Sequence, residues 1–370
     1  MDALVIAELI GGLVILTFGA ETLVRGASHL AALWGMPPLI IGLTVVAYGT
    51  STPELAVSLH ASLAGNPGIA VANVVGANIF NVLCVLGVCA SMIPLVISRQ
   101  LVRIDVPIMI GASLLLWGTA LDGALSRVDG AVFIAAIVVY TVWSVRLSLR
   151  ERPDVAEDLL QAYEHRHARA GRSVARHLVV MIAGLAMLLV GAHWLVDSAV
   201  AVARAFGVSD VIVGLTVVAI GTSLPELTTS LVAIIRGQQD IAVGHIIGSN
   251  IFNILGILGV SALAAPNGLI VAPAMIDMDI PIMVVVAVAC LPIFFTGFRI
   301  VRWEGLIFLI AYGAYTTYLV LDAYDHDALH PFRAVLLYGA LPLAAIMIIG
   351  SAIQALHNRE GRSESDRSAN

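Results

Sequence analysis

One stretch decides the fold of this chain: Gly42-Leu-Thr-Val-Val-Ala-Tyr-Gly-Thr-Ser-Thr-Pro-Glu-Leu-Ala-Val-Ser-Leu59. It recurs 172 residues later as Gly214-Leu-Thr-Val-Val-Ala-Ile-Gly-Thr-Ser-Leu-Pro-Glu-Leu-Thr-Thr-Ser-Leu231, with 14 of the 18 positions identical. A second motif follows each copy at the same offset, Val75-Gly-Ala-Asn-Ile-Phe-Asn81 and Ile247-Gly-Ser-Asn-Ile-Phe-Asn253. The chain is therefore an internal duplication.

Both copies of the first motif place Gly-Thr-Ser-x-Pro-Glu inside an otherwise apolar run. Gly and Pro at membrane depth leave backbone carbonyls outside the helical ladder, and this is tolerated only where they face protein or a cavity. A single intramembrane Glu can be explained as a protonated, hydrogen-bonded packing residue. Two such residues at equivalent places, Glu54 and Glu226, favour a binding site instead.

The composition indicates a polytopic membrane protein. The 370 residues are 59% hydrophobic and only 12% charged, with a mean hydropathy of +0.97. Residues 1–20 lack a basic amino-terminal region, so we expect a first spanning helix rather than a cleaved signal. Cys84, Cys89 and Cys290 lie in apolar runs without metal-ligand spacing, which is typical of packing residues.

Apolar runs of about 20 residues, the length that spans a bilayer, predict eleven helices. They lie near residues 4–24, 38–63, 69–95, 105–121, 129–148, 178–203, 211–235, 241–264, 280–298, 304–321 and 333–354. The polar stretch 149–177 carries six of the 19 basic residues, all of them Arg, so the positive-inside rule places it in the cytoplasm. By alternation, the amino terminus is then outside and the carboxy terminus inside.

The duplication extends beyond the two motifs, because Ile104-Asp-Val-Pro-Ile-Met109 is similar to Met278-Asp-Ile-Pro-Ile-Met283. Each half then has five helices, and an odd number inverts the second copy in the membrane. We therefore expect an all-α polytopic membrane protein of two inverted five-helix repeats. The repeats occupy residues 1–148 and 178–325; the loop 149–177 joins them, and an eleventh helix with a disordered tail occupies residues 331–370. Inverted repeats with broken helices are typical of secondary transporters.

The paired motifs, within residues 42–81 and 214–253, resemble the two α-repeats of the cation/calcium exchanger superfamily, and most of all its prokaryotic sodium/calcium antiporter branch. The resemblance covers residues 1 to about 325. It implies ten core helices and the exchange of calcium for sodium by alternating access.

The resemblance also implies a set of ion ligands. Carbonyl oxygens of Thr50 and Thr222 would bind calcium beside Glu54 and Glu226. Further oxygens would serve flanking sodium sites and the centre, from Ala47, Ser51, Asn81, Ala219, Ser223, Ser249 and Asn253. For the hydroxyls, bonding back to their own helix is the alternative.

The residues themselves are compatible with these ions. Two carboxylates match one divalent or two monovalent cations, and calcium accepts a flexible set of oxygen ligands. Neither His nor Cys lies at ligand spacing within the motifs, which argues against zinc or copper. We expect no cofactor.

Three positions depart from the family pattern. Asn253 stands where several members carry Asp, so we expect no potassium coupling. Ala77 replaces a common Ser, which leaves one sodium site short of a hydroxyl. His245 occupies the position of Asn73 in the first copy, and we interpret it as a hydrogen-bonded packing residue rather than a proton sensor.

A calcium/proton antiporter, or an exchanger of another divalent cation, remains an alternative because carboxylates also carry protons. The hydroxyl ligands favour sodium. A channel or an intramembrane enzyme has no supporting motif. The expected partners are the lipid bilayer of a prokaryotic inner or plasma membrane and the transported ions, not nucleic acid, and a monomer is compatible with this pattern.

Overall fold

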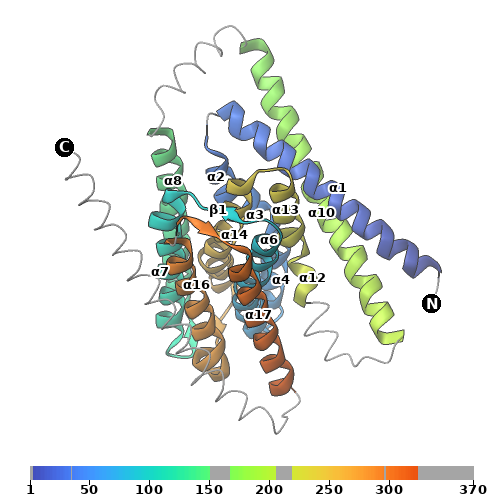
Figure 1. Cartoon of the computed structure of the whole chain (residues 1–370). Coiled ribbons are helices and arrows are strands. Elements are labelled where there is room, and N and C mark those ends of the chain that lie inside the picture. Colours follow the sequence, from blue (N-terminus) through green and yellow to red (C-terminus); the bar gives the residue numbers. More distant parts are fainter. Residues whose placement is uncertain (1–2, 35, 151–166, 206–218, 296, 324–370) are drawn as a thin grey trace.

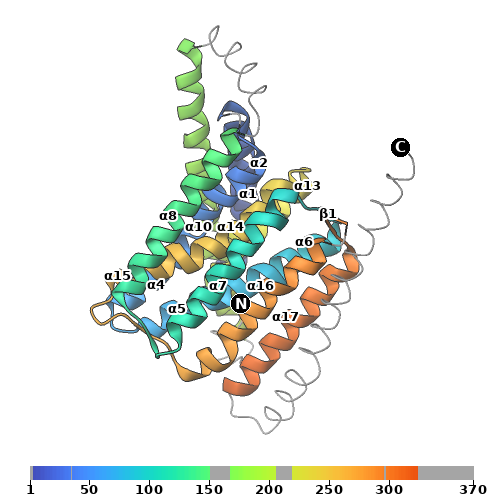
Figure 2. The same cartoon turned by 90° about the vertical axis from the view of Figure 1, so that its left-hand side faces the viewer.

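The computed structural model describes residues 3–34, 36–150, 167–205, 219–295 and 297–323, which are mostly helical (Figures 1 and 2). The first half contains α1 (Ala3–Trp34), α2 (Pro38–Ile41), η1 (Gly42–Val46), α3 (Ala47–Thr50), α4 (Thr52–Leu63), α5 (Pro67–Phe80), η2 (Asn81–Leu86), α6 (Gly87–Met92), β1 (Leu95–Val96), η3 (Leu101–Asp105), α7 (Val106–Ala120), β2 (Ala124–Leu125) and α8 (Arg127–Arg150). The second half contains α10 (His167–Ala205), α12 (Ala219–Thr222), α13 (Leu224–Ile235), α14 (Gln239–Ile251), η5 (Phe252–Leu258), α15 (Gly259–Ala264), β3 (Leu269–Ile270), η6 (Met275–Asp279), α16 (Ile280–Phe295), β4 (Arg299–Ile300) and α17 (Arg302–Ala323). The η elements are π-helical.

The helices of the described part are those of a multi-pass membrane protein. Eight helical runs are long and apolar enough to span a membrane, or nine when the pair Pro38–Thr50 and Thr52–Leu63, bent by 46°, is one broken span. The expected helix near 333–354, the residues 206–218 and the loop residues 151–166 lie outside the described part. The predicted ends of the first and sixth helices are wrong, because α1 continues to Trp34 and α10 already begins at His167. At about 1.5 Å per residue, both exceed the thickness of a bilayer core.

Two short antiparallel strand pairs join the halves of the chain. In the pair β1–β4, Leu95 lies opposite Ile300, and in the pair β2–β3, Leu125 lies opposite Leu269. Because β1 corresponds to β3 and β2 to β4 in the duplicated sequence, the two pairs are equivalent. Such reciprocal contacts are those of a two-fold relation between the repeats.

The longest helices, α1 and α10, repeat this reciprocity. Figure 1 shows them crossing along one side of the bundle. A Cβ on Gly12 would lie 3.0 Å from the carbonyl oxygen of Gly191, and a Cβ on Gly19 would lie 2.9 Å from that of Gly184. Glycine at these four places lets the two backbones approach closely, as in other membrane helix pairs.

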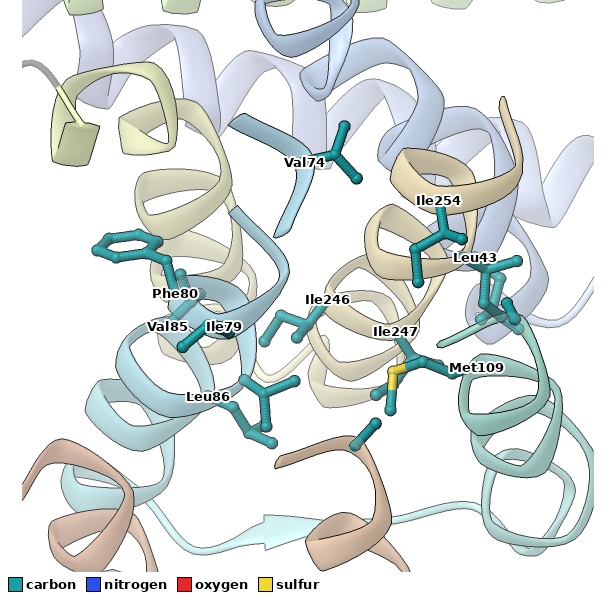
Figure 3. Packing of buried hydrophobic residues seen from close by; sticks show 14 of the residues in the cluster. Leu43, Val74, Ile79, Phe80, Val85, Leu86, Met109, Ile246, Ile247 and Ile254 are labelled. Atoms are coloured by element: carbon teal, nitrogen blue, oxygen red, sulfur yellow. The ribbon is translucent and has the colours of Figure 1, made fainter. Parts of the chain in front are cut away.

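The core lies where α5 and η2 meet α14 and η5. Side chains from these segments and from α7 meet there without solvent exposure, among them Ile79, Leu86, Met109, Ile246 and Ile247 (Figure 3). The helix α14 also contacts η1 directly: a Cβ on Gly248 would clash with the carbonyl oxygen of Leu43. The second motif of the second repeat, Ile247–Asn253, therefore packs against the segment that leads into the Gly-Thr-Ser-x-Pro-Glu sequence of the first repeat.

Candidate functional site

Both copies of the Gly-Thr-Ser-x-Pro-Glu sequence break their helix at the Ser, which occupies equivalent positions in the two repeats. Ser51 separates α3 from α4, and Ser223 separates α12 from α13, with backbone ψ angles of 14° and 11° instead of helical values. Proline follows two residues later and has no N–H for the helical ladder. In the first copy the carbonyl oxygen of Gly49 instead accepts the hydroxyl of Thr52 at 2.6 Å. The break places each Glu in the first turn of a new helix, where the helix dipole favours a negative charge.

The two glutamates are held by serines of the opposite repeat. Ser51 donates its hydroxyl to Oε1 of Glu226 at 3.2 Å, and Ser223 donates to Oε1 of Glu54 at 3.5 Å. Both carboxylates are buried, yet their Oε2 atoms have no hydrogen-bond partner among the described residues. The two motifs thus form one shared site, and each carboxylate keeps an unpaired acceptor.

Four asparagines form a second reciprocal cluster. Asn81 donates to Oδ1 of Asn250 at 3.0 Å, and Asn253 donates to Oδ1 of Asn78 at 3.1 Å. Asn78 and Asn250 in turn donate to each other's backbone carbonyl oxygens, at 3.2 and 3.4 Å. All four side chains are buried, and Oδ1 of Asn81 and of Asn253 has no partner within the part of the chain that the structure describes. This cluster therefore also leaves two neutral oxygens unpaired.

Thr50 lies directly before the first break and is tied to the other repeat. Its Oγ1 lies 2.7 Å from Nε2 of His245, whose Nδ1 lies 2.9 Å from Oγ of Ser230. At the equivalent place in the first repeat, Asn73 donates to Oγ of Ser58 at 3.0 Å and to the carbonyl oxygen of Glu54 at 3.2 Å. His245 is hydrogen-bonded, as expected, but its bond to Thr50 was not predicted.

The remaining predicted ligands lie in the same segments. Ala219 and Thr222 are the first and last residues of α12, and Ser249 lies on α14 with a buried hydroxyl that has no partner among the described residues. The carbonyl oxygen of Ala47 already accepts the N–H of Ser51 at 3.1 Å and the hydroxyl of Thr50 at 3.3 Å. An ion bound at Ala47 would have to share this oxygen.

Asn78 and Asn250 received no role from the sequence, although both stand in the repeated motif. A buried amide in an apolar helix needs hydrogen-bond partners. This requirement could have indicated that both asparagines bond to another part of the chain. Each amide nitrogen also approaches a methionine sulfur of the opposite repeat, Met283 at 3.7 Å and Met109 at 3.6 Å.

The donor set fits a hard cation. Within the described ranges, no group of three or more His, Cys, Asp or Glu side chains that could hold a metal ion is present. The glutamate pair and the asparagine cluster instead leave two carboxylate and two amide oxygens unpaired, and the buried hydroxyl of Ser249 is unpaired as well. Oxygen ligands of this kind suit cations such as calcium, magnesium or sodium better than soft transition metals.

Comparison with known proteins agrees with this chemistry. The model of the family described as sodium/calcium exchanger protein matches residues 4–146 and 176–321. The sodium/calcium exchanger MaX1 of Methanosarcina acetivorans is 32% identical over 338 residues, covering 83% of this chain and 96% of the relative. The inner membrane protein YrbG of Escherichia coli is 38% identical over 282 residues, covering 76% and 86%. Among solved structures, the sodium-calcium exchanger NCX_Mj soaked with sodium and without calcium gives a TM-score of 0.73 at 30% identity, over 87% of this chain and 99% of that one.

Proposed function

Since this chain belongs to the sodium/calcium exchanger family and is therefore a multi-pass cation-exchange transporter, not an enzyme, we propose that it exchanges calcium for sodium. Calcium and sodium would occupy the shared site in turn, and the site would open alternately to the two sides of the membrane.

The observation that carries this proposal is the reciprocal bonding of Ser51 to Glu226 and of Ser223 to Glu54. It joins two carboxyl groups from separate repeats into one buried site, with an unpaired oxygen on each. In their ionised form, the two carboxylates match one calcium ion or two sodium ions. Occupancy by one ion type therefore excludes the other, which is the requirement for exchange.

The proposed ligands follow the break in each repeat. Calcium takes the carboxylates of Glu54 and Glu226 and the carbonyl oxygens of Thr50 and Thr222. Sodium occupies sites on either side of the calcium site. The oxygen ligands of these sodium sites come from Ala47, Ser51, Ala219, Ser223 and Ser249, and Asn81 and Asn253 lie at the centre.

The experiment is uptake of radioactive calcium into proteoliposomes that contain the purified protein. Vesicles loaded with sodium and diluted into sodium-free buffer should take up calcium, and external potassium should not change the rate. Vesicles without sodium but with an imposed pH gradient should take up none. Uptake driven by the pH gradient alone would support a calcium/proton antiporter instead.

We further propose an external amino terminus and a cytoplasmic carboxy terminus. The arginine-rich stretch 149–177 supports this orientation through the positive-inside rule. Reporter fusions at the two ends should therefore report opposite sides. Two ends on the same side would contradict the eleventh helix.

A further inference from the structure

His245 has an environment that its sequence equivalent, Asn73, does not share. Both residues contact the equivalent serine of their own repeat, Ser230 for His245 and Ser58 for Asn73. The second partner of Asn73 is a backbone carbonyl of the same repeat, whereas the second partner of His245 is the Thr50 hydroxyl of the opposite repeat. The imidazole therefore connects the two repeats at the break.

The contacts around His245 are satisfied by one neutral tautomer. The Thr50 hydroxyl has a single proton, which it shares between two carbonyl oxygens of its own helical segment, that of Val46 at 3.1 Å and that of Ala47 at 3.3 Å. Its oxygen then accepts the Nε2–H of His245, and the unprotonated Nδ1 accepts the hydroxyl of Ser230. His245 is 0% exposed, so water does not compete for these bonds.

We infer that His245 is a positioning residue: through the Thr50 hydroxyl, the second repeat fixes the geometry of the first-repeat break. Thr50 is the last residue of α3, and Ser51 after it has already left helical geometry. Of the backbone hydrogen bonds that lie outside the regular helices and strands of the described part, none is accepted by the Thr50 carbonyl oxygen. The hydroxyl bonds thus hold the residue whose carbonyl would bind calcium in the proposed function, and they reduce the ordering entropy that ion binding must overcome.

This inference rests on the proposed function, in which the Thr50 carbonyl binds calcium. It predicts that the reach of the side chain at position 245 matters more than its polarity. The Asn amide ends three bonds from Cα, as Nδ1 of His does, and can serve only Ser230. The Gln amide ends four bonds from Cα, as Nε2 does, and can reach Thr50.

The test is sodium-driven uptake of radioactive calcium by His245→Asn and His245→Gln. Both variants must first be shown to be monodisperse in detergent, which confirms that they are folded. His245→Asn should raise the half-saturating calcium concentration about five-fold, the equivalent of one neutral hydrogen bond, with little change in maximal rate. His245→Gln should stay near the wild-type value. Equal values for the two variants, or a loss confined to the maximal rate, would overturn the inference.

A double-mutant cycle adds a second criterion. Thr50→Val removes the hydroxyl and should raise the half-saturating calcium concentration as His245→Asn does, and combining the two should cause no further rise. Thr316→Val, which removes a hydroxyl bonded within α17, is the matched control and should behave as wild type. Additive effects would contradict the inference alone; a wild-type protein without sodium-driven uptake would contradict the proposed function as well.

Discussion

The first-repeat and second-repeat halves of the site share their inner contacts and differ in the contacts around them. Each repeat contributes one Ser-to-Glu bond and one Asn-to-Asn bond to the other, so the carboxylates and asparagines are equivalent. Around them, however, Asn73 of the first repeat corresponds to His245 of the second, and Ala77 corresponds to Ser249. We interpret the equivalent residues as the part of the site that binds both ions. The residues that differ between the repeats would change the ion affinity of one half of the site only.

The largest effect is expected where the halves are equivalent. Glu54→Gln and Glu226→Gln should each lower sodium-driven calcium uptake about 100-fold or more, because removing one partner of a buried charged interaction costs about 3 kcal/mol or more. The two losses should be equal within error. Initial uptake rates in proteoliposomes provide the measurement.

The control for this comparison is Glu8→Gln, which neutralises a carboxylate on α1 outside the site and should leave uptake near wild type. If one glutamate variant kept normal exchange while the other lost it, the halves would not be equivalent and the shared site would be wrong.

An intermediate effect is expected from adding charge to the asparagine cluster. Oδ1 of Asn81 and of Asn253 is buried and unpaired, so Asn81→Asp and Asn253→Asp each add a third negative charge beside an unpaired oxygen. The second carboxylate oxygen replaces the amide nitrogen that donates to Asn250 or Asn78. Each should lower the half-saturating calcium concentration by about ten-fold, or about 1.4 kcal/mol, and slow the release of calcium.

Concentration dependence of uptake distinguishes the possible results. Equal shifts in the two variants would support the interpretation that the two repeats contribute equivalent asparagines to the site. A shift in the opposite direction in either variant would mean that its Oδ1 does not face the bound cation.

The smallest effect is expected where the halves differ. Ala77→Ser supplies the hydroxyl that Ser249 provides in the second repeat, so it should lower the sodium concentration that gives half-maximal exchange. Ser249→Ala should raise it. Either change is a several-fold effect, about 1 kcal/mol for a neutral contact. If Ala77→Ser has no effect while Ser249→Ala does, a water molecule or another side chain already completes the first sodium site.

The duplicated motifs were enough to predict the helical repeats, the helix breaks and the glutamate pair, because identity at a fixed offset places residues at equivalent positions. The hydrogen bonds between the repeats could not be predicted from the sequence. Thr50 and His245 are 195 residues apart, and helical periodicity carries no information about such pairs. The ends of α1 and α10 were missed for a related reason, since hydropathy measures the bilayer-spanning part of a helix and not the turns that project beyond it.

The central claim is that one calcium site is built jointly by both repeats, and equilibrium binding of radioactive calcium to the purified protein in detergent tests it most directly. We expect one calcium ion bound per chain, displaced by sodium, and lost in Glu54→Gln and in Glu226→Gln alike. Two ions per chain, with each variant losing only one of them, would show two separate sites and contradict the account.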